Sequence, residues 1–293
     1  MTCTGSPWPS VSTERFRATA ISPREAASVW TAGQPWGWTG EPRGGSGAGG
    51  TVLLPERLPG SMLTFDHILP LHLADVTFPA EHPLAGQHGP VYGYAIRHPD
   101  GLVLVDTGVG WGDADVDEAY QPRRRPLPEV LGAHGLHPQD VALVINTHLH
   151  FDHCGLNHLF PQVPIYVQAE EYTAAHTLPH FTILAWVDFP DAQYEQVSGE
   201  HELLPGVRLL PTPGHTPGHQ SVVLETEHEL VVLAGQAIYS VAEYRQVLAT
   251  GELLAGGSGD REQAGRSAKQ LIRLKPQRVY FSHDDGFWWE RPT

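Results

Sequence analysis

The segment THLHFDHCG, residues 147–155, concentrates residue types that bind metal ions. It places His148, His150, Asp152 and His153 within six positions. Neutral imidazole is the commonest side-chain ligand for zinc, manganese or iron, and a carboxylate among imidazoles adds charge that suits a second ion. His148 and His150 can point to one side of the chain, while Asp152 and His153 lie beyond a change of direction and can face a neighbouring ion. The pattern therefore predicts a metal site.

Polar residues of the same kind end several apolar runs elsewhere in the chain. VLVD ends at Asp106, ALVINTH at His148, VVLAGQ at Gln236 and VYFSH at His283. A single such residue can simply mark where a strand reaches water, but ligands of α/β proteins gather at strand ends on one edge of a sheet. Together with the loop PTPGHTPGH, residues 211–219, these residues indicate one shared site.

Short apolar strands with interspersed helices are expected from Met62 onward, which indicates a layered α/β protein. A helix is expected from Asp260, its capping residue, with Gln263 at the capping-box position and Pro276 beyond its end. Residues 98–101 form the turn expected between the first two of these strands. The expected strands and hairpins cover residues 90–98, 101–108, 141–148, 220–236 and 277–285.

Composition excludes several classes of protein. The net charge of −15, with Arg123–Arg125 as the only dense basic run, argues against nucleic-acid binding. No apolar stretch approaches the roughly 18 residues of a membrane span, and no export signal is visible at the N-terminus. Two cysteines far apart in sequence do not support a disulfide framework, so a reducing cytoplasm is expected.

Residues 1–61 are predicted to be a disordered N-terminal extension. Glycine, proline and serine dominate segments such as GQPWGWTGEPRGGSGAGG, which leaves little apolar surface to repay the entropy of ordering. An upstream-extended reading frame and a tail whose tryptophans dock on the domain are the two alternatives. We expect that removing residues 1–61 would leave folding and activity nearly unchanged, and that residues 62–293 form the catalytic domain.

The motifs HLHFDH, VDTG, GHTPGH and FSH, in this order, resemble those of the metallo-β-lactamase-fold hydrolases. The resemblance covers about residues 62–293, and the HxHxDH motif is highly specific for that superfamily. HLHFDHCG, the tyrosine three residues after position 236 and SHD near the C-terminus look most like the N-acyl-homoserine lactonases. The fold implied is α/β, a four-layer αββα sandwich with metal ions at one edge of its two sheets.

The resemblance implies a ligand set for two metal ions, with Zn²⁺ expected and Mn²⁺ or Fe²⁺ as alternatives. Asp106 would orient ligands, and Thr216 and His219 would support the loop around His215. The first ion would be held by His148, His150 and His215, and the second by Asp152, His153 and His283.

Position 236 departs from the family pattern. The family usually has an aspartate that bridges both metals after LAG, but this chain reads LAGQAIY, with Gln236. A neutral amide oxygen is a poorer bridge, so two cations would repel each other more strongly. A weaker second site is expected, and occupancy by a single ion is the alternative.

The reaction that the resemblance implies is metal-assisted hydrolysis of an ester or lactone, because a bound metal lowers the pKa of water to about 7. Tyr239 would contact the substrate carbonyl and Asp152 would pass a proton to the departing alkoxide, so these two residues are the predicted catalytic groups. Cys154 follows the motif, is expected to open a helix, and is interpreted as a small buried residue rather than a nucleophile.

N-acyl-homoserine lactone hydrolysis, that is quorum quenching, is the activity that the resemblance favours. Other hydrolases of the superfamily, acting on a phosphoester, thioester or aryl ester, and a non-catalytic metal-binding scaffold are the alternatives. The apolar segments HTLPHFTILAWVDFP, residues 176–190, and DGFWWE, residues 285–290, could line an acyl pocket, pack against the domain or form a homodimer contact.

Overall fold

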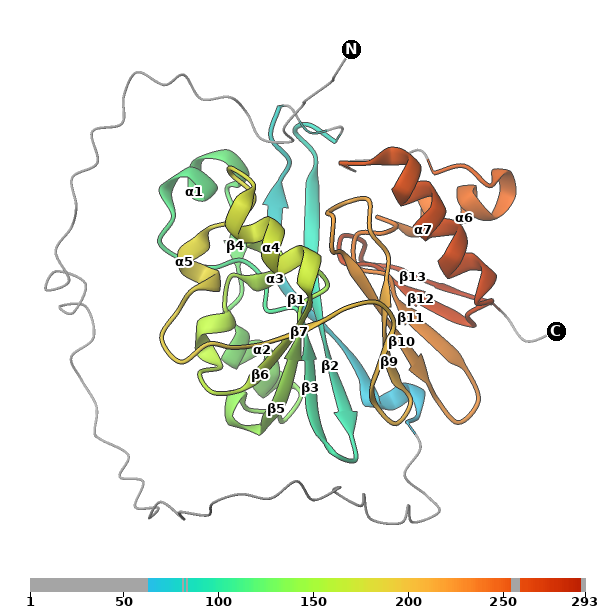
Figure 1. Cartoon of the computed structure of the whole chain (residues 1–293), viewed down its shortest axis with the longest axis horizontal. Coiled ribbons are helices and arrows are strands. Elements are labelled where there is room, and N and C mark those ends of the chain that lie inside the picture. The colour runs from blue at the N-terminus through green and yellow to red at the C-terminus, as the bar shows by residue number, and fades with distance from the viewer. Residues whose placement is uncertain (1–62, 81, 83, 254–258, 291–293) are drawn as a thin grey trace, which may run out of the picture. The chain divides into compact units, whose positions relative to one another are not determined.

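The computed structural model describes residues 63–80, 82, 84–253 and 259–290. The predicted N-terminal extension, residues 1–61, lies outside the described residues, and its disorder stays a prediction. The described chain begins with a 3₁₀ turn, η1 (Phe65–His67), and its strands form two mixed sheets (Figure 1).

The first sheet contains seven strands in the order β4-β1-β2-β3-β5-β6-β7. Its hairpins come first in the chain, and β3, β5, β6 and β7 then run parallel to one another. The strands are β1 (Ile68–Thr77), β2 (His88–His98), β3 (Gly101–Val105), β4 (Arg123–Arg124), β5 (Val141–Ile145), β6 (Pro164–Gln168) and β7 (Gln193–Val197).

The second sheet contains six strands in the order β13-β12-β11-β10-β9-β8. Its neighbours are antiparallel except for β11 and β12, which run parallel. The strands are β8 (His201–Leu204), β9 (Val207–Pro211), β10 (Gln220–Glu225), β11 (Leu230–Leu233), β12 (Arg278–Tyr280) and β13 (Phe287–Trp289).

The two sheets pack face to face through alternating side chains. Val103 and Val105 of β3 contact the same buried cluster as Val222 and Leu224 of β10. Leu104, between the two valines, points to the opposite face of its sheet and packs under a helix. This period of two is the one expected of strands buried on both faces, because successive side chains leave a strand on opposite sides.

Helices cover the two outer faces, as Figure 1 shows for α2 and α4 on one side and α6 and α7 on the other. Leu127 and Leu131 of α2 are fully buried against the first sheet, and Val247 and Leu271 of α6 and α7 pack against the second. The helices are α1 (Ala114–Tyr120), α2 (Leu127–Ala133), α3 (Phe151–Cys154), α4 (Ala169–Thr177), α5 (Leu184–Val187), α6 (Val241–Thr250) and α7 (Arg261–Arg273), and the remaining 3₁₀ turns are η2 (Pro138–Asp140) and η3 (Asn157–Leu159). The predicted αββα sandwich is confirmed.

Most of the predicted elements are found where the sequence places them. Asp260 caps α7 by accepting a hydrogen bond from the Gln263 amide at 3.0 Å. Cys154 was expected to open a helix, and this expectation is wrong. The helical turn α3 begins inside the motif at Phe151 and ends at Cys154, because the chain turns directly after His150.

The loops after β3 and β5 lie against each other backbone to backbone. The Gly155 amide donates to the Gly108 carbonyl at 2.9 Å, and the Thr107 amide donates to the His153 carbonyl at 2.8 Å. A Cβ atom on Gly155 would overlap the backbone nitrogen of Gly110. The missing side chain therefore lets the loop that carries Asp106 approach the loop that carries His153.

We predict that Gly155→Ala lowers the free energy of unfolding by about 3 kcal/mol, because the added methyl group overpacks a backbone contact. Gly132→Ala in α2 is the matched control, since a Cβ there meets no atom within 4 Å. The control should be neutral or stabilising by up to about 1 kcal/mol. Urea denaturation of both variants measures the difference, and equal midpoints would contradict the close approach.

Candidate metal centre

Six side chains converge where the strands of both sheets end, in two groups of three. The potential ligand atoms of each group lie within 4.8 Å of one another. The first group is His148, His150 and His215, and the second is Asp152, His153 and His283. The structure thus brings together each of the two predicted ligand sets.

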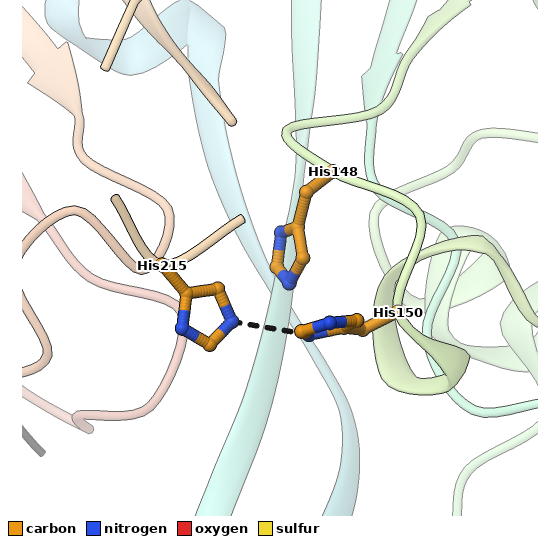
Figure 2. Close-up of side chains that lie close together, drawn as sticks. All are labelled: His148, His150 and His215. Atoms are coloured by element: carbon orange, nitrogen blue, oxygen red, sulfur yellow. Dashed lines mark hydrogen bonds between the residues drawn. The ribbon is translucent and has the colours of Figure 1, made fainter. Parts of the chain in front are cut away.

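The first group joins loops of the two sheets. His148 and His150 follow β5 of the first sheet, and His215 follows β9 of the second (Figure 2). The His215 Nε2 atom lies 3.1 Å from His150 Nδ1, and the His148 and His215 rings stand perpendicular with centroids 4.8 Å apart. Three imidazoles thus surround one point, and three imidazoles are the donor set of many zinc sites.

The second group places one carboxylate between two imidazoles. The Asp152 Oδ2 atom lies 3.6 Å from His153 Nε2 and 3.5 Å from His283 Nε2. Asp152 and His153 belong to α3, while His283 follows β12 of the other sheet. The carboxylate adds a negative charge that favours a cation at this position.

Hydrogen bonds on the far side of three rings fix which nitrogen faces the centre. The Nδ1 atoms of His153 and His283 donate to Asp106 Oδ2 at 2.8 Å and to the Pro90 carbonyl at 2.9 Å. Thr147 Oγ1 donates to Asp106 and therefore accepts from His148 Nδ1 at 3.1 Å. In its neutral form, each ring consequently turns an unprotonated Nε2 atom inward.

Those inward nitrogens pass a test of fit for metal ions. The Nε2 atoms of His148, His153 and His283 are buried and have no hydrogen-bond partner within the described chain, and the same is true of Gln236 Oε1. Leaving a buried acceptor without a partner costs about 1–3 kcal/mol. Cations at the two groups would satisfy all four atoms, so the residues fit the metal ions that the motif implies.

Burial keeps most of the imidazoles neutral. It lowers the pKa of His148 and His150 well below the usual value, and the neighbouring histidines lower both further. Burial also lowers the pKa of His283 to about 4. For His153 burial acts in the same direction, but the Asp152 and Asp106 carboxylates outweigh it and raise the pKa. Neutral imidazole is the form that binds a metal ion.

Asp106 and His219 lie behind the ligands. Both Asp106 oxygens accept from Thr147, from its amide and its hydroxyl, at 2.8 Å. The His219 Nε2 atom accepts a hydrogen bond from the Gln236 backbone amide at 2.9 Å, and its Nδ1 atom donates to Thr212 Oγ1 at 2.9 Å. Both ring nitrogens of His219 are therefore occupied by protein groups, as expected of a residue that supports a loop.

Gln236 and Tyr239 stand together at the edge of the second group. The Gln236 Nε2 atom donates to the Tyr239 hydroxyl at 2.6 Å, and the Tyr239 ring stacks on His283 with centroids 5.3 Å apart. Burial raises the pKa of Tyr239, so its hydroxyl keeps its proton.

The family model of the Metallo-beta-lactamase superfamily matches residues 86–283, which include all six of these candidate ligands. This chain belongs to the metallo-β-lactamase superfamily. The family and the fold predicted from the motifs are both confirmed.

Relatives within the superfamily agree with the predicted class of enzyme, a metal-dependent hydrolase. An N-acyl homoserine lactonase of Bacillus cereus is 34% identical over 212 residues, which cover 67% of this chain and 81% of the relative. The N-acyl homoserine lactonase AttM of Rhizobium radiobacter is 25% identical over 223 residues, 68% of this chain and 83% of its own. An N-acyl homoserine lactone hydrolase, solved with the product N-hexanoyl-L-homoserine at its catalytic metal center, superposes with a TM-score of 0.62 and 29% identity over 75% of this chain and 92% of that one.

In this superfamily member a pocket opens directly over the two groups. Its polar lining residues are His150, Asp152, His215, Gln236 and Tyr239. Val76, Phe78, Tyr120 and Phe151, which we call its apolar wall, line it too, as does His82. This wall was missed from the sequence, although the aromatic residues of TFPAEH, residues 77–82, directly follow β1.

The two segments considered for an acyl pocket lie elsewhere. Of residues 176–190, Phe181 comes near the site, with its ring 5.0 Å from His150, but the segment does not line the pocket. DGFWWE forms the edge strand β13. Of the three alternatives left open for these segments, lining is not the one found at this pocket, whose apolar side chains come from β1, the residue after it, α1 and α3.

Glu171 is a second residue that the sequence did not single out. It is fully buried on α4 and accepts hydrogen bonds from the Leu149 amide at 2.9 Å, the Thr216 hydroxyl at 2.6 Å and the Gly218 amide at 3.0 Å. Burial raises the pKa of Glu171 to about 7, against the effect of these donors. One side chain thereby ties the loop of His148 and His150 to the loop of His215.

The chemistry of Cys154 agrees with its interpretation as a packing residue. Its side chain is fully buried, and the thiol donates to the Leu149 carbonyl at 3.4 Å. Burial raises the pKa of the thiol to about 12, so it stays protonated at neutral pH.

We predict that Glu171→Ala lowers the free energy of unfolding by at least about 3 kcal/mol, because three buried donors lose their acceptor. Glu170→Ala, at the exposed neighbouring position, is the control and should be nearly neutral. Urea denaturation measures both variants. If Glu171→Ala unfolds at the same midpoint as Glu170→Ala, then Glu171 does not join the two loops.

Proposed function

We propose that this protein is a metal-dependent lactonase that opens the ring of N-acyl homoserine lactones, and that its biological role is quorum quenching. The observation that carries the proposal is the meeting of two histidine-rich ligand groups at the base of one pocket, with a protonated tyrosine beside them. Relatives named for this reaction, at up to 35% identity, support the choice of substrate.

Two zinc ions are the proposed cofactors. His148, His150 and His215 would hold one ion, and Asp152, His153, His283 and the Gln236 oxygen would hold the other. Bound zinc supplies Lewis acidity and lowers the pKa of water to about 7. The nitrogen and oxygen donors suit zinc better than the harder Mg²⁺ or Ca²⁺ ions.

The chain's own residues would position the lactone and handle its protons. Tyr239 keeps its proton and can donate a hydrogen bond to the carbonyl oxygen as negative charge develops there. Asp152 lines the pocket and is placed to take up the proton that the attacking water releases and to pass it to the alkoxide that leaves as the ring opens. Phe78 and Phe151 offer an apolar surface to the acyl chain.

A single experiment tests this function: bound metal per chain is measured together with turnover of short-chain and long-chain homoserine lactones and of a phosphotriester. We expect metal-dependent turnover of the lactones. Turnover of the phosphotriester alone would indicate another hydrolase of the superfamily. Bound metal without turnover of any substrate would indicate a metal-binding scaffold.

We predict that His215→Ala abolishes lactone turnover and releases the more tightly held ion, because two imidazoles remain where three were. Elemental analysis after dialysis measures the ion. His176→Ala, an exposed histidine on α4 that bonds Asp188 at 3.0 Å, is the control and should keep both metal and activity. An active and fully metallated His215→Ala protein would refute the ligand assignment.

We predict that Gln236→Asp raises the affinity for the second ion, because it adds one negative charge beside two cations. The unaltered protein should lose that ion first on mild chelation, and calorimetric titration with Zn²⁺ measures the change. Gln193→Asp, on the exposed face of β7, is the control for added charge. If the unaltered chain binds two ions equally tightly and Gln236→Asp does not raise the affinity, then Gln236 does not belong to the metal centre.

Three expectations of the sequence stay predictions. These are the cytoplasmic location inferred from cysteine usage, the homodimer contact and the absence of nucleic-acid partners. Within the described ranges, no helix combines the length and the apolar character needed to span a membrane.

A further inference from the structure

The nitrogen and the oxygen of the Gln236 side-chain amide face different neighbours. Its nitrogen donates to the Tyr239 hydroxyl at 2.6 Å, whereas its oxygen is buried and lacks a hydrogen-bond partner among the described residues, as do the inward nitrogens of His148, His153 and His283. Gln236 itself is 5% exposed, so the direction of the amide is determined by these neighbours rather than by water.

The metal-binding chemistry of the centre favours this direction of the amide. An amide oxygen carries partial negative charge and lies where cations would be held, while the opposite direction would aim two N–H groups at them. A bound cation therefore favours the oxygen towards the metal groups and the nitrogen towards Tyr239.

A phenol has one proton and can be either donor or acceptor towards a given neighbour. A carboxylate at position 236 could only accept, so it would draw the Tyr239 proton to itself. The amide nitrogen of Gln236 can only donate, so the phenol oxygen must accept and its proton must point elsewhere. Tyr239 lines the pocket, so the pocket is the direction left for that proton.

We infer that Gln236 is a positioning residue for Tyr239: its amide holds the phenol oxygen as an acceptor, and the phenol proton is directed into the pocket towards an incoming carbonyl oxygen. This deepens the proposed function and rests on it for the identity of the carbonyl. Glutamine at position 236 thus lacks the negative charge that a carboxylate would place at the metals, but it fixes the Tyr239 hydroxyl as a hydrogen-bond donor in the pocket.

The neighbours of both residues hold this arrangement. The Gln236 backbone amide is fixed by His219 at 2.9 Å, and the Tyr239 backbone amide donates to Glu243 Oε2 at 2.6 Å. The Tyr239 ring also stacks on His283. Because the two backbone amides and the Tyr239 ring are held by these contacts, the Gln236 and Tyr239 side chains are already in place for the hydrogen bond between them.

Neutron diffraction from zinc-loaded crystals exchanged into D₂O tests the inference without reference to activity. A deuteron on Gln236 Nε2 should point at the Tyr239 oxygen, and the Tyr239 deuteron should point away from Gln236 into the pocket. Tyr94 is the internal control, because its hydroxyl donates to the Phe281 carbonyl at 2.8 Å and its deuteron must lie on that line. A Tyr239 deuteron directed at Gln236 would overturn the inference.

A double-mutant cycle tests the consequence for catalysis, with bound metal measured in every variant. In the unaltered background, Tyr239→Phe should lower kcat by at least about 10-fold, because a donor to the developing oxyanion is lost. In the Gln236→Glu background the phenol already donates to the carboxylate, so Tyr239→Phe should change kcat by less than about 3-fold. Gln193→Glu is the control for the charge change.

The cycle and the diffraction experiment separate the two proposals. An equal cost of Tyr239→Phe in both backgrounds would overturn the inference even if the protein is a lactonase. If the metal-loaded protein turns over no lactone, the proposed function fails, and the direction of the Tyr239 deuteron still decides whether Gln236 positions the phenol.

Discussion

The burial of unprotonated imidazole nitrogens at one point is the constraint on which the rest of the structure depends. The Nε2 atoms of His148, His153 and His283 are buried and have no hydrogen-bond partner in the part of the chain that the structure describes, which is unfavourable unless cations are held there. The rings come from both sheets, so their approach requires the sheets to pack with these strand ends at one edge. The hydrogen bond behind each of these three rings then determines which nitrogen faces inward.

Three carboxylates near this centre make different contacts, because each is buried in a different place. Asp106 accepts from Thr147 and His153 and so fixes a ligand from behind, while Glu171 accepts from the two loops that carry the first ligand group. Asp152 alone lines the pocket. Asp106 and Glu171 thus hold a histidine ring and two loops in place, and Asp152 is the carboxylate proposed for metal and proton chemistry.

Gln236 shows how one substitution changes two properties of a site. A neutral amide weakens the electrostatic attraction for a second cation, yet it gains a donor that a carboxylate lacks. Its bond to Tyr239 links the edge of the metal centre to the wall of the pocket. In the proposed function, metal affinity and the direction of the Tyr239 hydroxyl are therefore coupled through the Gln236 side chain.

The sequence alone indicated the candidate ligands and the layered fold. Four of the candidate ligands lie within six positions directly after a buried strand, and the apolar runs of β3, β5, β11 and β12 each lead into a polar residue of the site, so local spacing carried the information. Tertiary structure decided the rest. Glu171 and Glu170 are adjacent glutamates on α4, and only packing against the loops of His148 and His215 makes one of them a buried acceptor. Phe78 and His82 become pocket residues because the segment after β1 reaches the metal groups, and the direction of the Gln236 amide follows from neighbours on either side of it, which sequence spacing does not encode.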